Sequence, residues 1–160
     1  MKPTATPTNG TAVRLAGTLS LGVGPAFSQS DDGGVKDWVT GVAELDVSLS
    51  MDYDPSMEWG LAASAGTGDT RLTVLVPRVR LLKDAGGEGI RYFGTLGVPV
   101  AFSPEMYLGA ELGGGIIYPL WRMFELVGAL HVDTLFALDP LSSADTVFMF
   151  NASVGGRMIF

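Results

Sequence analysis

Residues 153–160 read Ser153-Val154-Gly155-Gly156-Arg157-Met158-Ile159-Phe160, and this closing stretch decides the fold. Counting back from Phe160, every second residue belongs to an apolar file that continues to Phe148, while the residues between are mostly small or polar. A period of two over this length predicts a β-strand with one apolar and one polar face. Ending on such a strand, with an aromatic residue last, is unusual for a soluble domain, whose termini usually fray.

The same alternation recurs along the chain, in eight segments altogether. They cover about 12–24, 38–52, 57–66, 70–82, 90–102, 106–118, 122–138 and 146–160. Turn-forming residues separate them, and the longest connection is Pro25–Asp37. In the fourth segment, Pro77 is expected to mark a bulge or a phase slip. An even number of long strands is what a closed antiparallel barrel requires, so the sequence predicts an all-β, eight-stranded, up-and-down barrel.

Composition limits the class of protein further. The 160 residues suit one domain, expected as a flexible leader over 1–11 followed by the barrel over 12–160. Hydrophobic residues make up 47% of the chain, yet no run approaches the length of a membrane helix. The net charge of −7 argues against a nucleic-acid partner, and the absence of cysteine excludes disulfides and thiolate metal sites. The first ten residues lack the apolar core of a signal peptide, so we expect a mature form with an added Met1.

Alternation alone leaves open which face meets lipid, because a soluble sandwich shows the same pattern. The polar file is too small and too rich in glycine for a solvated surface, and it fits a narrow lumen. Aromatic residues in the apolar phase also gather toward the two ends, with Phe102, Phe136 and Phe148 at one of them. An aromatic girdle is predicted at the other end, beside Phe160, from Tyr53, Trp59, Tyr92 and Tyr118. The sequence therefore predicts a transmembrane barrel.

The chain from about residue 12 resembles the eight-stranded bacterial outer-membrane barrels of the OmpA and OmpX type. The resemblance rests on the strand pattern and on a terminal assembly signal formed by Ser153, Gly155, Met158 and Phe160. It implies a monomer in the outer membrane with both termini in the periplasm. It also implies contact with outer-membrane lipids and lipopolysaccharide, and insertion by the barrel-assembly machinery. The expected outer loops, Pro25–Asp37, Gly66–Asp69, Ser103–Glu105 and Asp139–Asp145, are short for the family, which puts adhesion in doubt; Pro25–Asp37 remains the expected contact site for a partner.

Charged residues in the polar phase are expected to project into the lumen. They are Arg14, Glu44, Asp46, Glu58, Arg78, Arg80, Arg91, Glu111, Glu125, His131, Asp133 and Arg157. Because an unpaired ion in such an interior costs several kcal/mol, we predict a network that joins the glutamates to arginines. The predicted partners of Glu44, Glu58, Glu111 and Glu125 are Arg14, Arg78, Arg80 and Arg157.

The only conceivable acid–base pair is His131 with Asp133, in the order His131-Val132-Asp133. Eight-stranded lipid A deacylases carry a His-x-Ser pair that faces lipid, whereas this pair has no serine and an inward phase. We therefore expect no enzymatic activity, no cofactor and no metal site, although His131, Asp133 and Glu125 are metal-binding residue types. The expected role is structural or surface-related. The alternatives are a narrow pore gated by the lumen network, a soluble lipocalin-like binder, and an engineered barrel.

Overall fold

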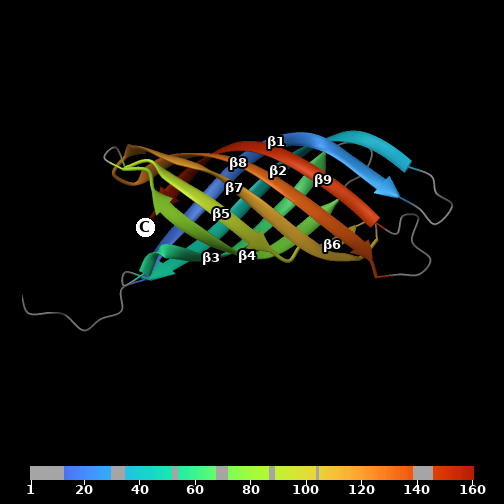
Figure 1. Ribbon diagram of the computed structural model, residues 1–160, viewed down its shortest axis with the longest axis horizontal. Helices are drawn as coiled ribbons and strands as arrows, with labels where there is room; N and C mark the ends of the chain where they lie inside the picture. The colour runs from blue at the N-terminus through green and yellow to red at the C-terminus, as the bar shows by residue number, and fades with distance from the viewer. Residues whose placement is uncertain are drawn as a thin grey trace, which may run out of the picture.

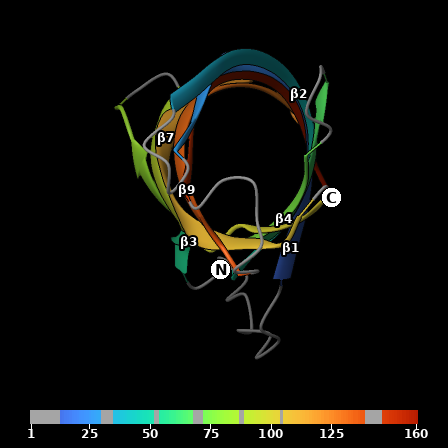
Figure 2. The ribbon, with the colours of Figure 1, turned by 90° about the vertical axis from the view of Figure 1, so that its right-hand side faces the viewer.

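The computed structural model describes residues 13–29, 35–51, 54–67, 72–86, 89–103, 105–138 and 146–160. These residues form nine strand segments that wrap around one axis (Figures 1 and 2). The segments are β1 Val13–Gln29, β2 Val35–Met51, β3 Asp54–Thr67, β4 Thr73–Asp84, β5 Arg91–Gly97, β6 Val100–Ser103, β7 Tyr107–Trp121, β8 Phe124–Ala137 and β9 Thr146–Ile159. In this part of the chain, no helix is long and apolar enough to cross a membrane.

The sheet closes on itself, because β1 pairs with β9 and the other pairings join strands that follow one another around the barrel, all antiparallel. Both β5 and β6 pair with β4 on one side and β7 on the other, with the same register, so they are two parts of one strand. The nine segments therefore make eight strands around the barrel. The prediction of an all-β, eight-stranded antiparallel up-and-down barrel is confirmed.

The interruption between β5 and β6 has its cause in two prolines. Pro99 lies at the break and has no N–H to donate, and Pro77 of β4 lies opposite Val98. The Val98 N–H still donates to the Pro77 carbonyl at 3.0 Å, and Gly109 N–H donates to the Pro99 carbonyl at 2.9 Å. The prediction of a bulge or phase slip at Pro77 was wrong: the register of β3 and β4 runs unbroken through this residue.

The stagger of the strands, or shear, is found by following paired residues once around the barrel. The path returns to β3 ten residues from where it began, through Thr67, Gly41, Val23, Ala152, Leu130, Gly114, Gly94, Leu81 and Met57. At ordinary strand spacings, this stagger over eight strands gives a tilt of about 40° and a backbone radius of about 8 Å. An interior of that width is filled by side chains.

The first hairpin is longer than the sequence indicated. Pairing between β1 and β2 extends to Gln29 and Val35, so most of the expected Pro25–Asp37 loop lies in strands. Ala26 is fully buried and Ser28 is buried, so the alternation of the barrel wall continues here. The loop prediction was wrong because Pro25 is an outward residue of a paired strand rather than the start of a turn. Figure 1 shows β1 continuing to the end of the barrel opposite the C-terminus.

The apolar file of each strand lies on the outside of the cylinder. Leu45, Leu126 and Phe150, which a soluble core would bury together, are 53%, 44% and 45% exposed. On one continuous strand line, Tyr92 and Phe102 point outward ten residues apart. At about 3.3 Å per residue and a tilt of about 40°, they lie about 25 Å apart along the axis, which is the height of the apolar band of a membrane barrel. The apolar exterior thus has the dimension of a bilayer core.

Candidate functional site in the barrel lumen

Inward-facing charged side chains of β2, β3, β4, β5, β7, β8 and β9 form one connected group of ions. The buried members include Asp46, Glu58, Arg78, Glu111 and Arg157, each 3% exposed or less. Strand alternation positions them, since each lies in the phase opposite to the outward apolar file. In the described part of β1, the buried residues of this phase are apolar or carry hydroxyl groups.

Arg78 of β4 is the centre of this group. It contacts Glu44 through both guanidinium NH2 groups, at 2.8 and 3.0 Å, and Asp46 at 3.3 Å. Its second NH2 group also donates to Glu111 at 2.9 Å. A single guanidinium therefore joins carboxylates of β2 and β7, which lie on different sides of the lumen, and its side chain is only 1% exposed.

A second set of pairs continues the network toward the end where Phe160 lies. Arg80 contacts Asp46 at 3.0 Å and Glu58 at 3.8 Å. Arg157 donates to both oxygens of Glu58, with Nη1 to Oε2 at 3.0 Å. Its Nε lies 3.2 Å from Glu125. Since Glu58 is on β3 and Arg157 is on β9, this pair crosses the lumen between strands that are not neighbours.

The structure brings together most of the residues predicted for the network and adds one arginine to the predicted partners. Arg14 lies at the exposed end of β1. Arg91 takes part, because it contacts Glu125 at 2.5 Å. Its inward phase was visible in the sequence, but no sequence pattern indicates which carboxylate an arginine meets across a barrel.

His131 and Asp133 lie in the lumen, as their phase indicated, and not against lipid. His131 is buried and its Nδ1 lies 3.2 Å from Glu111. One carboxylate oxygen of Asp133 is buried without a hydrogen-bond partner among the described residues. Within those residues, no three histidine, aspartate or glutamate side chains are arranged to hold a metal ion. Among the described residues, the contact given for the His131 ring is the one with Glu111.

Part of the lumen is apolar, whereas the sequence indicated a polar lumen filled by side chains. Toward the end opposite Phe160, inward side chains form a cluster, called here the apolar plug: Ala62, Val74, Val76, Ala101, Tyr107, Leu135 and Val147. A smaller cluster of Leu82, Phe93, Ile117 and Val127 lines the other end, where Arg80 lies 5.2 Å from the Phe93 ring centre. The alternation hides these residues, because an inward valine and an outward valine look alike in sequence.

The predicted girdle residues that the structure describes all face outward. Trp59, Tyr92 and Tyr118 are exposed, while Tyr53 lies outside the described residues. The sequence reasoning did not include Trp121 and Phe124 of the β7–β8 turn, whose exposed rings meet edge to face at 6.2 Å. The turn places both rings at the same end of the barrel as the predicted girdle. Their position beside a hairpin turn was the sequence feature that could have indicated this.

The residues of the predicted assembly signal lie on β9. Ser153 and Gly155 face inward, and Met158 is outward and half-buried. Phe160 is exposed and its N–H donates to the Leu15 carbonyl at 2.8 Å. A Cβ at Gly155 would lie 2.4 Å from the Leu19 carbonyl oxygen, so the close approach of β9 to β1 requires glycine.

The chain is a closed eight-stranded cylinder with apolar side chains outside and ion pairs inside, which is the arrangement of outer-membrane β-barrels. Solved structures share this fold. Neisserial surface protein A matches with a TM-score of 0.67 and 11% identity, over 91% of this chain and 99% of that one. The N-terminal barrel domain of Pseudomonas aeruginosa OprF matches with a TM-score of 0.59 and 13% identity, over 90% and 97%. Ail, the attachment invasion locus protein of Yersinia pestis, matches with a TM-score of 0.54 and 13% identity, over 91% and 98%. No protein-family model and no curated protein matches the sequence.

Proposed function

We propose that the protein is an integral protein of the bacterial outer membrane with a structural or surface role, both termini periplasmic, and a lumen closed to ions. The apolar exterior and the likeness to solved outer-membrane barrels support the location. On this proposal, the functional parts of the molecule are its lipid-facing outer surface and the side chains that fill the lumen. The protein acts as a monomeric, non-enzymatic barrel whose partners are outer-membrane lipids and lipopolysaccharide, together with the assembly machinery during insertion.

The observation that carries a closed lumen is the presence of two different fillings in series. Arg78 fills the middle of the lumen and is held by three carboxylates. Beyond it, Leu135 and Ala101 of the apolar plug are completely buried. A hydrated ion would have to separate the ion pairs and then pass an apolar constriction where nothing replaces its water. The two barriers are chemically independent, so loss of one leaves the other.

Single-channel recording in planar bilayers tests this proposal. Protein refolded into detergent, with its folded state verified by a shift in gel mobility on boiling, should insert and give no discrete current steps. The variant Arg78→Met should also stay silent, because the apolar plug remains. Combining it with Leu135→Ser and Val147→Ser should produce small steps. Discrete steps from the wild-type protein would overturn the closed lumen and support a narrow pore.

The surface part of the proposal rests on the first hairpin. Its strands continue to Gln29 and Val35, and Phe27 near its end contacts Phe150 edge to face at 6.3 Å. This contact fixes the hairpin to the wall. A cysteine placed at Gln29 should react with a membrane-impermeant maleimide on intact cells, and one placed at Asp84 should react only after the outer membrane is opened. The reverse pattern would refute periplasmic termini.

A further inference from the structure

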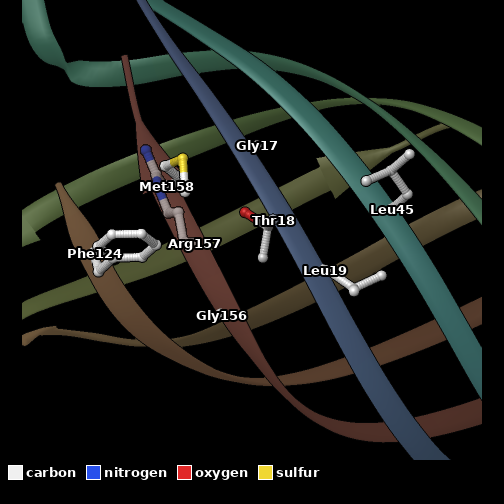
Figure 3. Close-up of a pocket in the computed structure, with 8 residues that line it drawn as sticks. All are labelled: Gly17, Thr18, Leu19, Leu45, Phe124, Gly156, Arg157 and Met158. Carbon is white, nitrogen blue, oxygen red and sulfur yellow. The ribbon is translucent and has the colours of Figure 1, made fainter.

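A groove on the outer surface crosses the seam where β1, the first strand, pairs with β9, the last strand. The groove measures about 380 Å³. Its lining comes from β2, β1, β9 and β8: Leu45, Gly17, Thr18, Leu19, Gly156, Arg157, Met158 and Phe124. Figure 3 shows Leu19 and Leu45 at one end, Phe124 and Met158 at the other, and the two glycines between them.

Two missing side chains create the groove. Gly17 pairs with Met158, and Leu19 pairs with Gly156, so bulky and absent side chains alternate across the seam. A Cβ at Gly156 would meet no atom within 4 Å, and one at Gly17 would meet only the Phe160 ring at 4.0 Å. Backbone packing therefore does not require glycine at these two positions, in contrast to Gly155. The groove therefore exists because these two outward positions carry no side chain, and not because the strands need glycine there in order to pair.

The chemistry around the groove indicates its occupant. Most of the lining is apolar and lies in the band that faces hydrocarbon, so an acyl chain is what the groove meets. Its Phe124 end adjoins the β7–β8 turn, where Arg122 is exposed and Trp121 is 74% exposed. The Met123 carbonyl accepts a hydrogen bond from Ile159, which fixes this turn beside the end of β9. An interfacial arginine beside an aromatic ring suits a lipid phosphate.

We propose that the seam groove binds one phospholipid of the periplasmic leaflet, with an acyl chain along Gly17 and Gly156 and the phosphate at Arg122. This inference rests on the proposed location and orientation, because the end that carries Arg122 must face the periplasm. The groove then differs from the rest of the wall, where lipids exchange without a preferred position. A retained lipid at the seam also covers the two strands whose pairing closes the barrel.

Native mass spectrometry of the detergent-purified protein, titrated with dioleoyl phosphatidylglycerol, tests the site. The wild-type protein should bind one lipid at least tenfold more tightly than any later one. Gly17→Val and Gly156→Val, which fill the groove, should remove this first tight step. Gly94→Val is the matched control: Gly94 is an exposed glycine of β5, away from the seam, and its Cβ would also meet nothing within 4 Å. It should bind as the wild type does.

Further measurements test the phosphate contact and distinguish the lipid site from its alternatives. Arg122→Ala should weaken phosphatidylglycerol several-fold and leave dioleoylglycerol, which has no phosphate, unchanged. Equal binding of both lipids by the wild type would overturn the phosphate contact. Equal loss in all three glycine variants, or a groove-dependent dimer in the mass spectrum, would overturn the lipid site. In either case, a retained gel shift on boiling would show that the membrane barrel itself stands.

Discussion

Replacing Arg78 with methionine should destabilise the barrel more than any other single change in the lumen network. Arg78 contacts Glu44, Asp46 and Glu111, and its side chain is 1% exposed. Methionine has a similar length and no charge, so the change removes the ion without opening a large cavity. Asp46 keeps Arg80, and Glu111 keeps His131. Glu44 keeps no ion-pair partner among the described residues.

The expected loss follows from the carboxylate left behind. Removing one partner of a buried pair costs about 3–5 kcal/mol. A stranded glutamate can instead take up a proton, which at pH 7 costs about 4 kcal/mol for an ordinary carboxyl group and at pH 5 about 1 kcal/mol. The Glu44 side chain is 13% exposed, which keeps the cost near the lower limit. We expect a loss of about 3–4 kcal/mol at pH 7 that shrinks as the pH falls, because the variant's folded state then gains a proton that the unfolded state lacks.

Reversible unfolding by guanidinium in phospholipid vesicles, followed by tryptophan fluorescence at pH 7 and pH 5, measures this loss. The matched control is Arg91→Met, since in the described part of the chain Arg91 pairs with Glu125 alone and its side chain is 22% exposed; the change should cost about 1 kcal/mol or less. In the Arg78→Met background, Glu44→Gln should restore much of the stability and remove the pH dependence. Equal losses for Arg78→Met and Arg91→Met, or a loss that is independent of pH, would refute the reasoning.

Three further changes test the wall. Leu96→Arg, at mid-height of the apolar band, should lower the unfolding free energy in vesicles by about 2–4 kcal/mol, whereas Tyr92→Arg near its edge should cost about 0–1 kcal/mol; similar costs would contradict the assigned bilayer level. Gly109→Ala should prevent folding, since its Cβ would lie 2.0 Å from a carbonyl oxygen, while Gly94→Ala should show a normal gel shift on boiling. Phe160→Ala should reduce the amount of folded barrel in cells without lowering its unfolding free energy in vitro, and an equal loss in both assays would argue against an assembly signal.

The strand pattern could be predicted from the sequence because the exterior obeys one rule. On every strand, most lipid-facing positions carry apolar residues, and their alternation with the inward residues is visible without any tertiary information. The ends of the strands were harder to predict from the sequence. Pro25 reads as a turn residue, yet it fits an outward position of the extended first hairpin because its partner Val39 continues the pairing. Proline and glycine indicate breaks only where a neighbouring strand does not supply the missing contacts.

The contents of the lumen could be predicted by residue type but not by partner. The phase of each strand placed Glu58 and Arg157 inside, although they are 99 residues apart and meet only because the barrel closes. Which carboxylate an arginine reaches depends on stagger and tilt, and neither is visible in one strand. The apolar plug was missed for a related reason: Val74 and Leu135 belong to the inward phase, and nothing local separates a plug valine from a wall valine.

The placement of ions inside has a consequence for how the fold is specified. Lipid hydrocarbon is as apolar as the side chains that face it, so the outer surface alone discriminates weakly between neighbouring registers. A slip of one residue between two strands would turn Arg78 or Arg157 toward lipid, at a cost of about 2–4 kcal/mol for each arginine at the bilayer midplane. It would also leave the carboxylates that these arginines contact without partners in the lumen. Arg157 of β9 contacts Glu58 of β3 across the lumen, so the register of the last strand depends on a strand in the N-terminal half of the chain. We therefore infer that the lumen network selects the register at which the barrel closes. The apolar plug, whose packing depends on no particular ion pair, then fills its part of the lumen once that register is reached.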